Sequence, residues 1–329
     1  MPLPHADQRL IVDGGWFDRS GRSRLEISGP DRAKFLHNLV TSDVKRLAEG
    51  SGSEAFVTSP QGKTMAYITI LATDRAILLR TEPESLEGIL PHLRKYGVFD
   101  DVSIDDISST TFEFHLIGSK LGQALAGRGF EAIPDRPLAH AGVAIEGAEI
   151  RFVRESPTGR PGLTLIGPIE AAGPIRALLE GEGLPELDPS TFEALRIEAG
   201  TPVSGRDVTP NHLPQEVGRD AQAINFVKGC YLGQETVARL DALGHVNKIL
   251  KGFRVEGEIV PPPGSSLMAE GKAVGTVTSS AWSSGWGGPV ALGYVRVAQA
   301  EPGTRLDLTF EGGEARATVA DLPMLPPTG

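Results

Sequence analysis

The chain has 329 residues, of which 40% are hydrophobic, and its 32 basic and 42 acidic side chains give a formal net charge of −10. A surface of that sign offers no overall attraction for nucleic acid or an anionic membrane. We therefore expect no direct nucleic-acid partner and no membrane partner. A local basic groove is compatible with this net charge. The single cysteine excludes an intramolecular disulfide and any metal or iron–sulfur site built from several cysteines of one chain.

The start of the chain, MPLPHADQRLIVDGG, lacks an apolar core of signal-peptide length. No run of about 18 apolar residues occurs further along, so no transmembrane helix is expected. We therefore expect a cytoplasmic protein whose thiol is kept reduced. The chain is long for one hydrophobic core, which favours two or three domains.

The first expected elements follow a polar leader. Residues 23–29 predict a short strand. Next, Asp31 can cap a helix that carries Phe35, Leu36 and Leu39 on one face. Strand-like runs follow at 54–59, 64–71 and 75–80, joined by a glycine turn at Gly62 and a hairpin turn at 73–74.

Helical spacing returns at 83–97, where Pro91 must kink or split the helix. The best-marked helix has Asp188 at its N-cap, Pro189 in its first turn and Gly200 as its stop. Between these helices we expect strands at 111–117, 149–154 and 163–166 and a helix at 170–181. Strands and helices interleave in this way up to residue 244, which favours an α+β fold for residues 1–244.

The composition changes after residue 244. Helical periodicity becomes weak, and short β-rich runs alternate with Gly and Pro turns at 273–282, 290–297, 304–310 and 315–323. This pattern is typical of a small antiparallel barrel or sandwich. We therefore expect a second domain at 245–329.

Three common site patterns are incomplete or absent. Gly-Lys-Thr at 62–64 resembles the end of a phosphate-binding loop, but Val57 stands where the first glycine is required and a strand follows, so a glycine turn is the better interpretation. The seven histidines form no His-Glu-x-x-His pattern, and no Gly-x-Ser-x-Gly occurs. We therefore expect neither a metal site nor the nucleophile elbow of a hydrolase.

The stretch KGCYLGQE, which begins at Lys228, contains the only cysteine. Gly229 and Gly233 permit backbone conformations closed to other residues, and a helix is expected to start at QETVARL with Glu235 in its first turn. Cys230 would lie just before this helix and beside Lys228, and both features lower the pKa of a thiol. The alternative is a buried cysteine that packs as a small hydrophobic residue.

KGCYLGQE closely resembles the hallmark Lys-Gly-Cys-Tyr-x-Gly-Gln-Glu of the YgfZ family of folate-binding proteins. The matching residues are Lys228, Gly229, Cys230, Tyr231, Gly233, Gln234 and Glu235. The resemblance covers most of the chain, because further segments are similar in the expected order: FLHNLVTSDV, LRIEAGTP, LPQEVG, GHVNKIL, GTVTSS and ALGYVR. The family is related to the glycine-cleavage T-protein, an aminomethyltransferase that uses tetrahydrofolate.

The resemblance implies the T-protein architecture, in which two intertwined ferredoxin-like domains and a C-terminal antiparallel β-barrel surround a central folate channel. It implies tetrahydrofolate or a derivative as the cofactor. It also implies a role in the assembly or repair of iron–sulfur clusters, often for enzymes that modify transfer RNA. The protein partners would then be iron–sulfur cluster carriers or client proteins.

The resemblance also implies roles for single residues. Cys230 would be a reactive thiol that serves as a transient cluster ligand or in redox exchange. Glu198 would pair with the amino and ring N–H groups of the pterin. Lys228, Tyr231 and Gln234 would complete the folate site.

One departure from the T-proteins bears on the chemistry. Their hairpin turn resembles NPKGGIIDD, whereas the matching run here is SPQGKTMAY, with Ala66 and Tyr67 at the acidic positions. A general acid or base needs an ionisable group within hydrogen-bond reach. Aminomethyl transfer is therefore disfavoured, unless Glu54 or Glu216 supplies a carboxylate from another segment. The alternatives are a transferase of the T-protein type and a docking scaffold that binds folate only vestigially.

Overall fold

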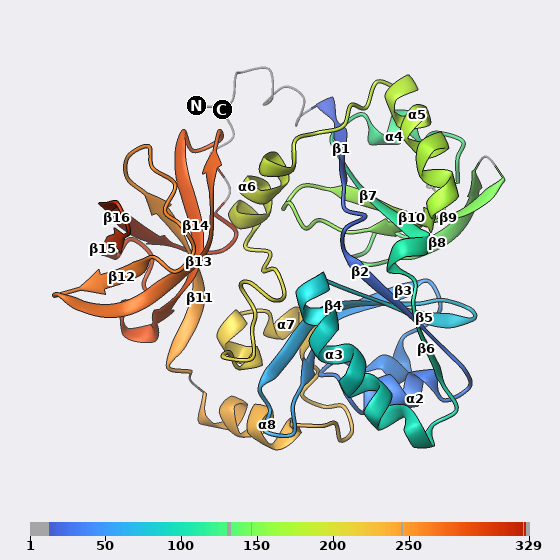
Figure 1. Ribbon diagram of the computed structural model, residues 1–329, viewed down its shortest axis with the longest axis horizontal. Coiled ribbons are helices and arrows are strands. Elements are labelled where there is room, and N and C mark those ends of the chain that lie inside the picture. The colour runs from blue at the N-terminus through green and yellow to red at the C-terminus, as the bar shows by residue number, and fades with distance from the viewer. Residues whose placement is uncertain (1–12, 130–132, 146, 245, 325, 327–329) are drawn as a thin grey trace.

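The computed structural model describes residues 13–129, 133–145, 147–244, 246–324 and 326. These residues form two five-stranded antiparallel sheets and a closed barrel of six strands (Figure 1). Most of the expected polar leader, residues 1–12, lies outside the described part. No helix in the described part is long and apolar enough to cross a membrane.

The first sheet, called here the β4 sheet, has the strand order β3-β4-β5-β2-β6. Its strands are β2 (Ser23–Ser28), β3 (Ser51–Thr58), β4 (Thr64–Ala72), β5 (Ala76–Thr81) and β6 (Ser103–Asp106). One face packs against α2 (Arg32–His37) and α3 (Pro83–Tyr96) in a shared apolar core. Because side chains alternate along a strand, Ala66 and Ile68 of β4 join this core, whereas Tyr67 is turned to the other face.

The second sheet, called the β7 sheet, has the strand order β1-β7-β10-β9-β8. Its strands are β1 (Gly15–Asp18), β7 (Thr111–Ile117), β8 (His140–Ile145), β9 (Ala148–Arg154) and β10 (Gly162–Pro168). The helices α4 (Leu121–Ala124) and α5 (Ala172–Gly181) cover one face, where Ile175 packs in the same core as Phe112. The other face meets the β4 sheet, since Val153 of β9 clusters with Leu71 of β4.

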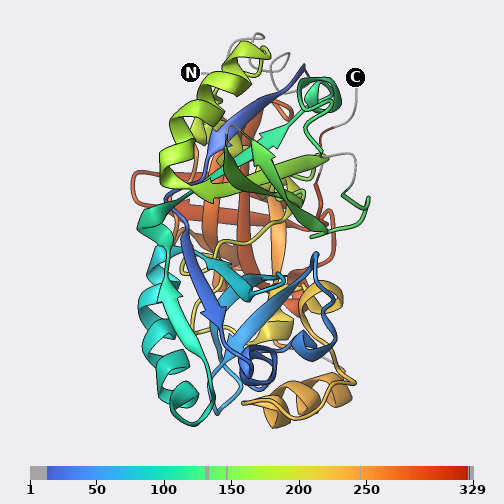
Figure 2. The same cartoon turned by 90° about the vertical axis from the view of Figure 1, so that its right-hand side faces the viewer.

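The chain crosses between the sheets more than once. β1 lies in the β7 sheet, β2 to β6 build the β4 sheet, and β7 to β10 complete the β7 sheet. The short helix α7 (Asp220–Ala223) then returns the chain to β3, and α8 (Gln234–Leu243) follows. Figure 2 shows the two sheets one above the other in front of the barrel. The expected intertwined α+β architecture is confirmed.

Helix α6 (Pro189–Ala199) lies between the sheets and the barrel (Figure 1). Its start is capped as predicted, because the Asp188 carboxylate accepts a 2.8 Å hydrogen bond from the Ser190 N–H, and Gly200 ends it with a φ of 73°. The helix contacts β1 and the barrel strands β13 and β14.

The barrel strands are β11 (Lys248–Val255), β12 (Ser266–Ala269), β13 (Lys272–Ser283), β14 (Gly288–Arg296), β15 (Arg305–Phe310) and β16 (Gly313–Ala320). They close in the order β11-β14-β13-β12-β15-β16, so the expected barrel is confirmed and a sandwich is not formed.

Three local expectations were wrong. Strand β1 lies in the region taken as a polar leader, because four residues are too few for a periodic signal, although Trp16 and Phe17 are buried. Asp31 precedes α2, but its carboxylate accepts a hydrogen bond from the Asp101 N–H and not from its own helix. Helix α3 is continuous through Pro91, so the split that was one of the two expected effects does not occur; Pro91 is exposed, and water can satisfy the backbone carbonyl that loses its donor.

Candidate functional site

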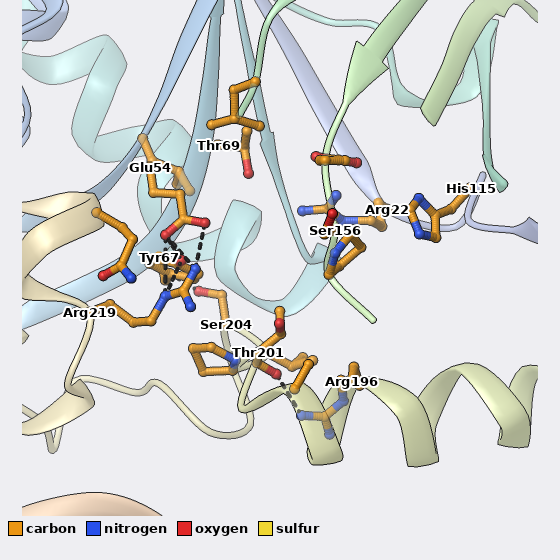
Figure 3. A pocket seen from close by; sticks show the side chains of 18 of the residues that line it. Arg22, Glu54, Tyr67, Thr69, His115, Ser156, Arg196, Thr201, Ser204 and Arg219 are labelled. Carbon is orange, nitrogen blue, oxygen red and sulfur yellow. Dashed lines mark hydrogen bonds and ion pairs between the residues drawn. The ribbon is translucent and has the colours of Figure 1, made fainter. Parts of the chain in front are cut away.

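A cavity of about 560 Å³ lies where the two sheets meet α6. Its wall combines β3 and β4 of one sheet, β7 of the other, the loop between β9 and β10, one face of α6 and the segment that follows α6. Figure 3 shows polar side chains at two opposite ends of this space. We name them the Arg219 end (Glu54, Tyr67 and Arg219) and the His115 end (Arg22, His115 and Ser156).

Hydrogen bonds join the three side chains of the Arg219 end. The Arg219 Nη2 lies 2.6 and 2.7 Å from the two carboxylate oxygens of Glu54, and the Tyr67 hydroxyl donates to the same carboxylate. Burial and the neighbouring Glu54 charge raise the pKa of Tyr67 well above its ordinary value, so the phenol stays protonated. The Nη1 of Arg219 makes no hydrogen bond with any residue that the structure describes. This edge is thus a donor available to a ligand.

The His115 end rests on a buried ionic network between the sheets. Arg80 of β5 donates at 2.8 Å to Glu113 of β7 and at 2.8 Å to Glu155, and Arg22 donates at 3.0 Å to Glu113. Burial alone disfavours the Glu113 charge, but Arg80 and Arg22 outweigh it and lower the pKa of Glu113 far below its ordinary value. The carboxylate is therefore an ionised structural group at neutral pH.

His115 itself is buried and lines the cavity. Its Nδ1 lies 2.9 Å from the Thr164 hydroxyl, whereas its Nε2 is buried and has no hydrogen-bond partner among the described residues. Burial lowers the pKa of His115 to about 4, so the ring is neutral at pH 7. No group of three or more His, Cys, Asp or Glu side chains in the described ranges could hold a metal ion.

Helix α6 presents one face to the cavity and another to the barrel. Phe192, Arg196 and Ala199 line the cavity, as their helical spacing requires. Glu198 does not line it. The Glu198 carboxylate is buried and accepts a 2.5 Å hydrogen bond from Ser283 of β13. Burial raises the pKa of Glu198. Its assignment as a pterin ligand stays a prediction.

The Lys228 side chain is buried and binds backbone carbonyl groups near the end of α2. Its Nζ donates at 2.6, 2.6 and 2.7 Å to the carbonyl oxygens of His37, Val40 and Ser42, at the end of α2. Burial lowers the pKa of Lys228 to about 7. The two segments FLHNLVTSDV and KGCYLGQE, which are 191 residues apart at the His37–Lys228 bond, therefore form one structural unit.

The remaining motif residues surround the start of α8, which begins at Gln234 with Glu235 in its first turn, as predicted. Cys230 is exposed, so it is not a buried core residue. Tyr231 is buried in the core between the sheets and the barrel. None of Lys228, Cys230, Tyr231 and Gln234 lines the cavity, and their roles in folate binding and thiol chemistry stay predictions.

The start of α8 is fitted to the hairpin between β3 and β4. Gly233 has a φ of 82°, and a Cβ there would collide with the carbonyl oxygen of Ser59 in the hairpin turn. A Cβ on Gly62, in the same turn, would lie 2.5 Å from the Cβ of Thr236. The motif glycine and the hairpin glycine are thus both required by one close contact.

The two positions where T-proteins carry acids point to opposite faces of β4. Ala66 is in the apolar core, and Tyr67 lines the cavity. Glu54 and Glu216 are the two residues expected to be able to supply the missing carboxylate. Glu54 lines the cavity beside Tyr67. Glu216 does not line it and accepts a 3.0 Å hydrogen bond from the backbone N–H of Leu213.

Several cavity residues had no signal in the sequence. Arg219, His115, Arg22 and Glu113 belong to no recognisable motif, and each acquires its role through a partner far along the chain, such as Glu54 for Arg219 at a separation of 165 residues. A buried charged residue inside a strand, such as Glu113 in TFEFHLI, is the signal that could have indicated an internal ion pair.

Comparison with known proteins shows which family the chain resembles over most of its length. The GCVT N-terminal domain matches residues 9–226, and the glycine cleavage T-protein C-terminal barrel domain matches residues 248–325. A putative chloroplastic transferase of Arabidopsis thaliana is 30% identical over 94% of this chain and 70% of its own length. The tRNA-modifying protein YgfZ of Colwellia psychrerythraea is 30% identical over 69% of this chain and 67% of its own length.

Enzymes of the glycine cleavage system are also similar. An aminomethyltransferase of Nostoc sp. is 26% identical over 94% of this chain and 84% of its own length. The crystal structure of aminomethyltransferase T from Bartonella henselae has the same fold, with a TM-score of 0.82 and 20% identity over 98% of this chain and 89% of that one. The fold, the family profiles over both parts of the chain and the two relatives at 30% identity lead to one conclusion: the chain is a YgfZ-like member of the glycine cleavage T-protein family.

Proposed function

We propose that the protein binds tetrahydrofolate or a derivative in the central cavity and supports the assembly or repair of iron–sulfur clusters through Cys230. The observation that carries the folate part is the cavity itself. Its volume of about 560 Å³ lies within the range of small-molecule sites. Within the described part of the chain, the Nη1 of Arg219 and the Nε2 of His115 have no hydrogen-bond partner, and such a donor and such an acceptor suit a ligand with both carboxylates and N–H groups.

The chain's own residues would hold the folate in complementary ways. Arg219 would donate to a carboxylate or carbonyl oxygen of the ligand. Tyr67 and Phe192 offer aromatic surface within the cavity wall. Glu198 adjoins the lining residue Ala199 and would reach the pterin by leaving Ser283. Bound tetrahydrofolate would supply a one-carbon carrier.

The iron–sulfur part rests on the resemblance to YgfZ and on the surface around Cys230. Cys230 is exposed, and the neighbouring Val227 and Phe226 are 89% and 42% exposed. Exposed apolar side chains beside a thiol suit a protein partner that brings its own cluster ligands. A lone cysteine cannot hold a cluster unaided, so the partner supplies the other ligands.

A folate-dependent aminomethyltransferase is the second candidate function, because Glu54 brings a carboxylate into the cavity beside the position of the missing acid. Both oxygens of that carboxylate already accept hydrogen bonds from Arg219, and Tyr67 donates to one of them. A carboxylate engaged in this way is a poor general base. Cluster maintenance is therefore the preferred function.

Titration of the purified chain with tetrahydrofolate in a calorimeter tests the folate site. We expect saturable binding of one ligand per chain. Binding to Glu198→Ala should be at least about tenfold weaker, because a charge-assisted hydrogen bond contributes roughly 1.5–3 kcal/mol. Ser283→Ala is the matched control, since it removes the partner of Glu198 and leaves the carboxylate. Absence of saturation with the wild-type chain would refute the folate proposal.

A further inference from the structure

His115 carries a buried polar atom without a partner at one end of the cavity. The side chain is 1% exposed, it lines the cavity, and its Nε2 makes no hydrogen bond with any described residue. Figure 3 shows it on the same side of the cavity as Arg22 and Ser156, opposite Glu54 and Arg219. Buried polar atoms are nearly always paired, so an unpaired one on a side chain that lines a cavity indicates a ligand or an ordered water.

The surrounding hydrogen bonds determine which ring nitrogen carries the proton. Thr164 Oγ1 lies 2.5 Å from a Glu155 oxygen that also accepts from Arg80 at 2.8 Å. An ionised carboxylate only accepts, so the Thr164 hydroxyl hydrogen is committed to Glu155. Thr164 must then accept from the Nδ1–H of His115. Since the ring is neutral, Nε2 carries a lone pair.

The ring is also held in place, so this lone pair has a fixed direction. Gly162 of β10 lies against the ring, and a Cβ at that position would be 2.7 Å from the His115 Cε1. The Phe192 ring contacts His115 edge to face, with 6.0 Å between centroids. Arg19 covers the Phe192 ring at 4.1 Å. A turned ring would lose the hydrogen bond between Nδ1 and Thr164, so the observed orientation, with Nε2 as the unpaired nitrogen, is preferred.

We propose that His115 determines ligand specificity, because its Nε2 accepts a hydrogen bond from an N–H group of the molecule bound in the cavity. The proposal rests on the proposed function, in which that molecule is a folate. Folates carry N–H groups on the pterin, on the bridge and in the glutamyl amide. Their carboxylates have no donor and are repelled by a fixed lone pair. The carboxylates therefore lie away from the Nε2 of His115, and the Nη1 of Arg219 is one donor open to them.

Two substitutions of His115 test this assignment by tetrahydrofolate titration. His115→Phe keeps the ring and removes the acceptor, so we expect binding about tenfold weaker than in the wild-type chain. His115→Gln restores an acceptor oxygen at the place of Nε2, so we expect affinity within about threefold of wild type. Thermal unfolding of both variants shows that the fold is retained.

Nitrogen-15 NMR of the imidazole is a readout that a purely structural histidine would not change. We expect an unprotonated Nε2 in the free chain and a shift of that resonance when tetrahydrofolate binds. If the wild-type chain binds folate while His115→Phe binds equally well and Nε2 does not shift, the acceptor serves a water only and the inference is wrong. A protonated Nε2 would also overturn it. Failure of the wild-type chain to bind folate would instead refute the proposed function on which the inference rests.

Discussion

At the scale of single residues, Glu113 shows how a charge is kept inside the molecule. Its carboxylate lies within 3.7 Å of guanidinium groups from Arg22, Arg24 and Arg80, and its side chain is 2% exposed. An uncompensated buried charge is far more costly than a buried pair. The network therefore determines how the β4 and β7 sheets are held together beside the cavity.

Glu113→Gln keeps the shape of the side chain and removes the charge that balances these arginines. We expect the free energy of unfolding at pH 7 to fall by about 3–5 kcal/mol. The measurement is urea denaturation. Glu26→Gln is the matched control, because Glu26 is an exposed strand residue of β2, and a surface change of this kind alters stability by less than about 0.5 kcal/mol.

The stability difference between the wild-type chain and Glu113→Gln should depend on pH, and the lowered pKa of Glu113 gives the direction. Because the pKa of Glu113 is lowered in the folded state, the unfolded chain binds more protons, and the carboxylate stabilises the fold above its ordinary pKa of 4.5. This contribution is lost as the pH falls below 4.5. The stability difference between wild type and Glu113→Gln should therefore shrink as the pH is lowered. A difference that stays constant down to acid unfolding would contradict the assignment.

At the scale of elements, helix α8 is placed by its contact with the β3–β4 hairpin. Gly233 begins the helix and Gly244 ends it, both with positive φ angles, of 82° and 72°. Their surroundings differ, because a Cβ on Gly233 would collide with the Ser59 carbonyl, whereas a Cβ on Gly244 would meet nothing within 4 Å.

Alanine at the two helix ends separates backbone strain from the contact. We expect Gly244→Ala to lower the free energy of unfolding by about 1 kcal/mol, which is the cost of a left-handed conformation with a Cβ. Gly233→Ala should lose roughly 2–3 kcal/mol more, because backbone atoms of the hairpin must shift. Urea denaturation of both variants measures the difference. Equal losses would show that the hairpin contact contributes nothing.

At the scale of the whole molecule, the relatives include an aminomethyltransferase and a tRNA-modifying protein, and the cavity disfavours aminomethyl transfer by this chain. Tyr67 occupies the cavity-facing acidic position, and Glu54 is held by Arg219. We expect no transfer of a methylene group from an aminomethyl-lipoyl carrier to tetrahydrofolate. A reconstituted glycine-cleavage assay measures this, with a T-protein as the positive control. If turnover exceeds that of a control reaction without this chain, the transferase becomes the preferred function.

The second expectation at this scale concerns Cys230, which lies outside the cavity. We expect iodoacetamide to modify Cys230 in the folded chain, because the thiol is exposed, and bound folate to slow this reaction. Cys230→Ala should keep the fold and fail to restore iron–sulfur enzyme activity in cells that lack the protein. Full restoration, with a thiol that reacts only after unfolding, would make the cysteine structural.

The sequence by itself determined the elements that carry local signals. Helix α6 was predicted from its N-cap and its glycine stop, and the strands of the barrel from alternating β-rich runs between turns. The start of α8 at Gln234 followed from the glycines of the motif. These features succeed because caps, turns and periodicity depend on residues within a few positions of one another.

Only the tertiary structure decided which residues share the cavity. Tyr67 was singled out as a missing acid, but its bond to Glu54 and the bond from Arg219 depend on how β3, β4 and the segment after α6 come together. The unpaired Nε2 of His115 is an acceptor because Thr164 of β10 binds Nδ1 and because Arg80 of the other sheet binds Glu155, the partner of Thr164. Lys228 was expected beside a thiol and instead binds three carbonyls near the end of α2. Such pairings join residues that are from 9 to 191 positions apart. Local sequence patterns carry no information about them, because sheet register and packing create the contacts.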